Sequence, residues 1–175
     1  MSELLGRDEI ESLLRELARR LNDAGLAAGI RVVGGAAIAL LNTDRRATRD
    51  IDALLLPAEP VQAAAAEMAI ERDLPTDWIN DAAKAFVPFV GLDEWHEIFH
   101  EGRVAVCVGS VEMLLAMKLR ANRGRRDTDD IEFLLEQCAV ASIEQAEEIY
   151  GRYHAQELLS PSASVRVASW LAARQ

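Results

Sequence analysis

The chain has 175 residues, of which 50% are hydrophobic and 27% are charged, and its formal net charge at pH 7 is -10. This length allows one substantial hydrophobic core, so we expect a single domain that covers residues 1–175. The negative charge argues against bulk binding to duplex DNA, because such binding relies on many lysines and arginines that neutralise phosphates.

The N-terminal segment begins MSELLGRDEIESLL, which has neither a basic nor an apolar leader region, and no apolar run in the chain could span a bilayer. We therefore expect a soluble, cytoplasmic protein that has no membrane partner. Apolar residues recur at helical spacing from Ile10 to Leu21, which predicts an amphipathic first helix. Asp8 and Glu11 are its expected capping residues, and Gly25 is its expected end.

Strand and helix patterns alternate in the next part of the chain. Residues 30–33 form a short apolar strand pattern, which turns at Gly34 and Gly35 into an alanine-rich helix. This helix is expected to end near Asn42. The run TRDIDALLLP, residues 48–57, predicts a second strand that its final proline stops, and a helix follows it.

The middle of the chain predicts a short helix and a hairpin. Thr76 can cap a short helix over residues 77–86. Residues 95–100 and 104–110 have extended patterns and are separated by a Glu-Gly-Arg turn, which predicts two antiparallel strands.

The rest of the chain has helical patterns. Helices are expected over residues 111–122, 128–138 and 142–159, the last opened by Ser142 and Gln145 as a capping box, and a tail follows Pro161. The order of elements predicts an α+β fold with a small mixed sheet flanked by helices, followed by a helical C-terminal region from about residue 111 to 175.

Residues 96–100, HEIFH, spell the zinc-protease motif. The motif requires a helix, on which His96 and His100 could reach one zinc ion while Glu97 activates its water. The β-branched and aromatic content instead favours a strand, which would separate the two histidines by about 13 Å. His154 is the chain's only other histidine, so a zinc peptidase is the least favoured hypothesis.

Asp50 and Asp52 interrupt the apolar run of the second predicted strand. Residues two apart on a strand face the same way, so both carboxylates are expected to project together. Carboxylates held this close repel each other unless a cation lies between them, and Mg²⁺ or Mn²⁺ suits oxygen ligands. An isolated D-x-D is more often a solvated strand edge. Gly34 and Gly35 upstream add a second signal, because a helix that starts after glycines presents backbone N–H groups to an anion.

The two glycines, followed some fifteen residues later by DID, resemble the signature of the nucleotidyltransferase superfamily of DNA polymerase β. The segment LLAMKLRANRGRRDTDDIEFLL is similar to minimal nucleotidyltransferases of toxin–antitoxin operons, including AbiEii-type toxins. The resemblance covers residues 31–135. It implies a nucleotidyltransferase core at about residues 25–110 that transfers a nucleoside monophosphate from an NTP to an acceptor hydroxyl of RNA, tRNA or protein. It also implies a toxin role with a cognate antitoxin as partner.

The resemblance assigns roles to particular residues. Gly34 and Gly35 would contact the triphosphate of the NTP, and Asp50 and Asp52 would hold the metal ion as catalytic residues. Lys118 would bind a phosphate, as the matching lysine does in the related toxins. Its position on the apolar stripe of a predicted helix also fits a lysine that extends out of the core.

A third catalytic carboxylate, which would act as the base, has no clear candidate in the sequence. Glu97 on the predicted hairpin is the first choice, although it also fits a surface charge. Asp130 is the alternative base. Asp127 fits a helix N-cap as well as it fits a catalytic group.

Two clusters of arginines flank these motifs and could bind the phosphates of an RNA acceptor, with Arg49 also close enough to contact the nucleotide. They are Arg45, Arg46 and Arg49, and Arg123, Arg125 and Arg126. The sequence therefore favours a metal-dependent nucleotidyltransferase, with a catalytically degenerate nucleotide-binding or partner-binding module of the same fold as the alternative.

Overall fold

The structure is a computed structural model that describes residues 4–42 and 47–174. These residues form two compact units. The sheet unit contains the described residues up to Ala85 together with Trp95–Gly109, and the helical unit contains Phe86–Glu94 and the described residues from Ser110 onward. A five-stranded mixed sheet and the surrounding helices confirm the predicted α+β fold.

The strands of the sheet unit lie in the order β3-β2-β1-β5-β4. Their bounds are Ala28–Val32 for β1, Ile51–Leu56 for β2, Ile79–Asn80 for β3, Trp95–Glu101 for β4 and Val104–Gly109 for β5. The central strand β1 is antiparallel to β2 and parallel to β5. Outside them, β3 is parallel to β2, and β4 forms the predicted antiparallel hairpin with β5.

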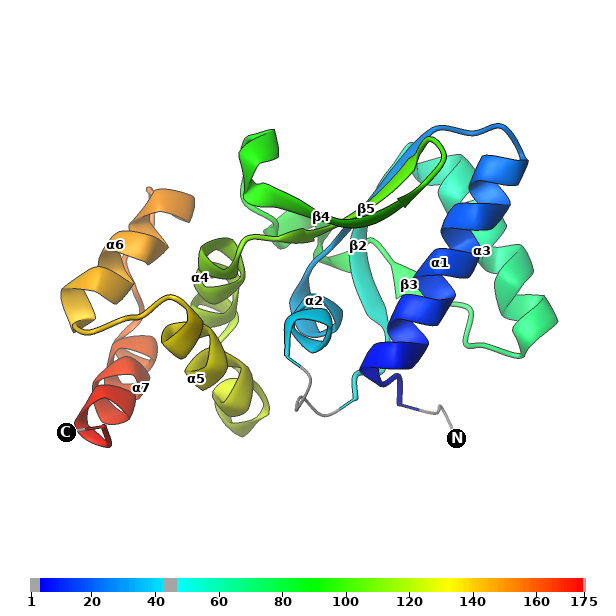
Figure 1. Ribbon diagram of the computed structural model, residues 1–175. Helices are drawn as coiled ribbons and strands as arrows, with labels where there is room; N and C mark the ends of the chain where they lie inside the picture. The colour runs from blue at the N-terminus through cyan, green and yellow to red at the C-terminus, as the bar shows by residue number, and fades with distance from the viewer. Residues whose placement is uncertain (1–3, 43–46, 175) are drawn as a thin grey trace. The chain divides into compact units, whose positions relative to one another are not determined.

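Three helices cover one face of this sheet: α1 (Arg7–Asp23), α2 (Gly34–Leu41) and α3 (Ala58–Arg72). The first helix, α1, contacts α2, α3, β4 and β5, and Figure 1 shows α1 and α3 side by side. Alternate strand residues are buried beneath these helices, namely Ile30, Val32, Ile51, Ala53, Leu55, Val104, Val106 and Val108. The residues between them are only partly buried and form what we call the open face, namely Gly29, Arg31, Asp52, Leu54, Ala105 and Cys107.

A register shift in the hairpin changes which side chains share a face of β4. Glu97 pairs with Cys107 on the open face, whereas Phe99 pairs with Val106, whose side chain is buried. The guanidinium carbon of Arg15, on α1, lies 4.2 Å from the centre of the Phe99 ring, which places Phe99 on the helix-covered face. Residues two apart on a regular strand share a face, but Glu97 and Phe99 lie on opposite faces because the bulge between them adds a residue to β4.

Two local expectations in the sheet unit are wrong. The N-cap of α1 is Gly6, and no side chain caps the helix, so Asp8 and Glu11 lie within the helix instead. Thr76 does not begin a helix over 77–86; the chain forms the short strand β3 and then a 3-10 helix, Ala82–Phe86. Pairing with β2 stabilises this extended segment through backbone contacts that its local sequence does not encode.

The helical unit consists of α4 (Val111–Ala121), α5 (Thr128–Gln137), α6 (Ile143–Tyr153) and α7 (Pro161–Ala172), with short 3-10 turns at Leu92–Glu94 and Gly124–Asp127. Ser142 caps α6 as predicted by accepting a bond from the Gln145 backbone, although the Gln145 side chain accepts from Ala141. The sixth helix ends earlier than expected, and the tail after Ser160 is itself helical.

Apolar side chains from all four helices form the core of the helical unit, including Leu114, Leu115, Leu134, Leu135, Ile149 and Val167. Among the described residues, no helix combines the length and the apolar character needed to cross a membrane.

Candidate functional site

The glycine turn and the aspartates of β2 lie together in the sheet unit. The backbone N–H of Val33 donates to the carbonyl oxygen of Asp52 at 2.9 Å, which extends the pairing of β1 and β2 by one residue. Gly34 follows with φ of +62°, and a Cβ atom at this position would lie 3.0 Å from Oδ2 of Asp52. Only glycine allows both this left-handed backbone and this close approach.

The N-terminus of α2 starts at this point. Val33 is the N-cap residue, and its side chain makes no capping hydrogen bond. The first backbone N–H groups of a helix have no partners within it, so those of Gly34 and Gly35 are available donors with a positive helix dipole behind them. Both glycines are partly exposed. The turn can therefore accept an anion next to the Asp52 carboxylate.

Asp50 lies in a bend directly before β2, which begins at Ile51, so the strand starts later than predicted. A neighbouring residue contacts its carboxylate: Nδ2 of Asn80, on β3, donates to Oδ2 of Asp50 at 3.2 Å. Asp50 is partly exposed, as is Asp52.

Asn80 also lies at this candidate site, although the sequence did not predict it. Its Oδ1 accepts from the backbone N–H of Ala82 at 3.0 Å, which fixes the orientation of the amide. The Nδ2 group then faces Asp50 and the carbonyl oxygen of Asp77, 3.2 Å away. In register, Asn80 is the direct partner of Asp52. The signal in the sequence is weak, because the strand that carries Asn80 has only two residues.

The donor set fits a hard divalent cation. Magnesium is commonly bound by one or two carboxylates together with substrate phosphates and water, and Asp50 and Asp52 offer such carboxylates beside an anion-accepting helix terminus. In the described part of the chain, no group of three or more His, Cys, Asp or Glu side chains could hold a metal ion. The remaining ligands of an ion bound here would thus come from phosphate and water.

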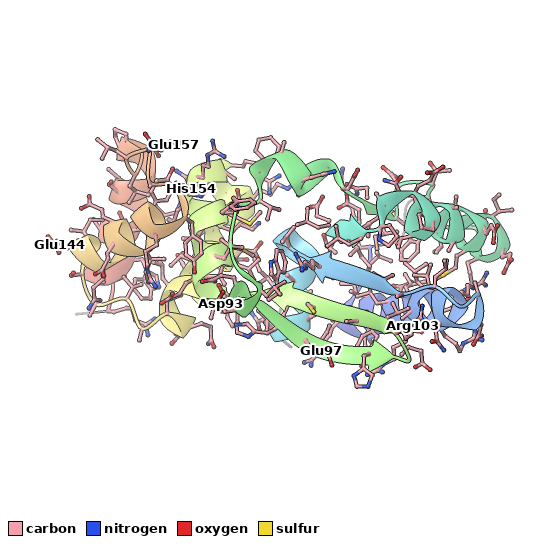
Figure 2. The ribbon with its side chains drawn as sticks, turned by 90° about the horizontal axis from the view of Figure 1, so that it is seen from above. Asp93, Glu97, Arg103, Glu144, His154 and Glu157 are labelled. Carbon is pink, nitrogen blue, oxygen red and sulfur yellow. The ribbon has the colours of Figure 1, made fainter. Side chains whose placement is uncertain are left out.

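Glu97 lies far from these aspartates. Its strand, β4, is at the outer edge of the sheet, where Figure 2 labels it, and β1 and β5 separate it from β2. Three strand spacings correspond to about 14 Å. The Glu97 carboxylate contacts Nδ1 of His100 at 2.8 Å, and both side chains are exposed. The structure therefore does not bring Glu97, the first choice for a third carboxylate, together with Asp50 and Asp52.

The HEIFH segment forms β4, as predicted, and not a helix. Its two histidines consequently do not occupy successive turns of one helix face, which is the arrangement that the zinc-protease motif needs. His154 is in the helical unit, where burial lowers its pKa.

The helical unit contains a second group of charged residues, which we call the lysine cluster: Lys118, Arg123, Asp127 and Asp130. Lys118 Nζ lies 2.8 Å from a carboxylate oxygen of Asp127 and 2.8 Å from one of Asp130. Arg123 adds hydrogen bonds to Asp127 from its backbone N–H at 2.7 Å and from Nε at 3.1 Å. The side chains of Lys118 and Asp130 are almost fully buried, and that of Asp127 is completely so.

This environment explains the behaviour of Asp127. Burial alone would raise the pKa of its carboxyl group, but the hydrogen bonds from Arg123 and Lys118 outweigh burial and hold the pKa well below its usual range. Asp127 does precede α5 as the N-cap residue, yet its side chain makes no capping bond. Its carboxylate instead joins α4 to the turn before α5.

The structure describes one of the two predicted arginine clusters completely and the other only in part. Arg49 is exposed next to Asp50, whereas Arg45 and Arg46 lie outside the described residues. Arg125 and Arg126 are exposed in the turn before α5, where phosphate groups could reach them. Arg123 is different because its guanidinium contacts Asp127.

A comparison with protein families identifies a match over most of the chain. Residues 9–159 match a family described as nucleotidyltransferase of unknown function, DUF6036. Searches of curated proteins and of solved structures found no significant match.

Proposed function

The chain belongs to the DUF6036 family of nucleotidyltransferases, and from this we propose that it is a Mg²⁺-dependent or Mn²⁺-dependent enzyme that transfers a nucleoside monophosphate from an NTP. In this proposal, Asp50 and Asp52 hold the metal ion, and the α2 N-terminus receives the triphosphate at Gly34 and Gly35. The observation that carries the proposal is the close approach of Gly34 to the Asp52 carboxylate. It supports a site where a cation and a phosphate are neighbours.

The chemistry proposed is a displacement at the α-phosphorus. The acceptor oxygen forms a bond to phosphorus, the bond to the β-phosphate breaks, and pyrophosphate leaves. The acceptor proton passes to a carboxylate of the aspartate pair or to water. A bound metal ion would supply neutralisation of phosphate charge and a lower pKa for the attacking hydroxyl. Asn80 would keep Asp50 in position through its Nδ2 group.

The acceptor and the biological role extend this proposal. We propose an RNA or tRNA end as the acceptor, because each unit carries exposed cations that suit a phosphate backbone, Arg49 in the sheet unit and, separately, Arg125 and Arg126 in the helical unit. A toxin role with an antitoxin partner is supported only by the resemblance of the sequence motifs. We also propose that the protein acts in the cytoplasm.

The test is to incubate the purified protein with Mg²⁺, each α-labelled NTP and total RNA, and to measure labelled RNA and released pyrophosphate. Asp52→Asn should lower the rate by about a hundredfold or more, because it removes a charge from the reacting centre. Asp8→Asn, at an exposed site on α1, is the matched control and should react at the native rate. Labelling by Asp52→Asn at the native rate would refute the proposal.

A second candidate is a module that binds nucleotide without transferring it. What favours it is the lack of a third carboxylate close to Asp52 among the described residues, since Asn80 occupies the paired position on the neighbouring strand. In this case NTP with Mg²⁺ should raise the melting temperature, but no pyrophosphate should form with any acceptor. Release of pyrophosphate that depends on Asp52 would exclude it.

A further inference from the structure

The open face of the sheet carries a cation to which the proposed reaction gives no role, Arg31 on β1. Arg31 lies directly between Leu54 of β2 and Cys107 of β5 in the sheet register. Its guanidinium carbon lies 5.3 Å from the centre of the Trp95 ring. A guanidinium within about 6 Å of an indole ring is attracted to the negative face of the ring. Trp95 therefore holds the Arg31 side chain on the open face.

The contact between Arg31 and Trp95 crosses the intervening strand β5. The residue of β5 that pairs with Trp95 is Gly109, which has no side chain. A larger residue at this position would project between the guanidinium and the ring, since directly paired residues face the same side of a sheet. The space over Gly109 therefore allows the contact.

Arg31 is also a close neighbour of Asp52. Leu54, its direct partner on β2, shares the open face with Asp52, two residues earlier. Asp52 is thus the diagonal neighbour of Arg31 across the antiparallel pair, at about 7–8 Å between backbones. An arginine side chain can span such a distance, so an anion bound beside Asp52 lies within its reach.

Arg31 remains available to an anion. In the described part of the chain, Arg31 forms no ion pair and no side-chain hydrogen bond, and its guanidinium lies against the Trp95 ring. Across the sheet, Arg31 pairs with Cys107, and Cys107 pairs with Glu97. Glu97 is thus separated from Arg31 by Cys107, and its carboxylate contacts His100 instead. Burial and Glu97 raise the pKa of Cys107, while Arg31 lowers it, which places both charges near this thiol. The guanidinium is partly exposed.

We propose that Arg31 binds a phosphate group of the nucleotide substrate beside Asp52, and that Trp95 is a positioning residue for its guanidinium. Arginine suits this role, because its planar fork can donate two parallel hydrogen bonds to one phosphate. The identity of the ligand rests on the proposed function, whereas the cationic site itself follows from the sheet.

The test measures binding of inorganic tripolyphosphate, and of each NTP, to the full chain in Mg²⁺ by calorimetry. Arg31→Gln should weaken binding by about tenfold or more, the effect of losing a charged hydrogen bond, and Arg31→Lys should bind with intermediate affinity. Arg103→Gln, in the turn of the same hairpin (Figure 2), is the matched control and should bind within about twofold of the native chain. Circular dichroism checks that each variant is folded.

The role of Trp95 has its own readout. Tripolyphosphate should change the tryptophan fluorescence of the native chain, and this change should disappear in Arg31→Gln, because the ligand no longer moves a guanidinium against the ring. Trp95→Leu should weaken binding, and Trp95→Phe should restore most of it, since phenylalanine also attracts a cation. Native affinity in Trp95→Leu would overturn the positioning role.

The proposed phosphate site is overturned if Arg31→Gln binds the probes with native affinity, or if the native chain binds neither tripolyphosphate nor any NTP. It is also overturned if Arg31→Gln and Arg103→Gln reduce the binding affinity equally. Its failure differs from that of the proposed function. Nucleotide transfer with unchanged NTP affinity in Arg31→Gln would refute the phosphate site alone. Binding that depends on Arg31 but yields no pyrophosphate would refute the transfer alone.

Discussion

Replacement of Lys118 by methionine tests whether this residue stabilises the helical unit. The variant keeps the length of the side chain but leaves Asp127 and Asp130, both buried, without their shared cation. Removal of one partner from a buried ion pair costs about 3–5 kcal/mol. Arg123 still contacts Asp127, so we expect a loss of unfolding free energy at the lower end of this range, about 3 kcal/mol. For a chain of this size, this corresponds to a melting temperature about 6–12 °C lower.

The assay is urea denaturation followed by circular dichroism, with Lys84→Met as control. Lys84 is the only other lysine of the chain and is exposed, so its replacement should change the free energy of unfolding by less than about 0.5 kcal/mol. The double variant Lys118→Met/Asp130→Asn should lose less free energy of unfolding than the sum of the two single losses, because both substitutions remove the same ion pair. A loss below about 0.5 kcal/mol in Lys118→Met, accompanied by weaker NTP binding, would refute a structural role and favour phosphate binding.

Three further predictions concern other parts of the chain. Gly34→Ala should lower the free energy of unfolding by about 1–2 kcal/mol because of its positive φ, and should also weaken NTP binding by displacing Asp52. Gly124 has φ of +61° with open space around it, so Gly124→Ala should lower only the stability. Thermal melting and calorimetric NTP binding measure the two effects. Because Asp127 has a depressed pKa when folded, its contribution to stability is present above about pH 4 and is lost as the pH falls below it; Asp127→Asn should therefore flatten the acid side of the pH–stability curve. Burial raises the pKa of Cys138 from 9.0 to about 11, so at pH 8 it should react with a thiol reagent about a hundredfold more slowly than an ordinary cysteine, and comparable rates would contradict this burial.

Several features of this protein follow from local sequence alone. Local patterns of apolar, turn and capping residues located the helices from α1 to α6 and the hairpin, because each of these patterns is visible within one segment of the chain. The two glycines predicted the turn before α2 for a similar reason, since a positive φ is a local requirement. The D-x-D pattern identified a strand with an inward-facing apolar side, although Asp50 lies just outside it.

The tertiary structure decided which side chains meet. Strand order, which no periodicity encodes, placed Glu97 at the far edge of the sheet and Asn80 beside the aspartates. The register across three strands brought Arg31 to Trp95, and a register shift in β4 turned Glu97 and Phe99 to opposite faces. These contacts join residues distant in the chain, so they depend on how whole elements pair and pack, whereas sequence spacing reports only on neighbours within one element.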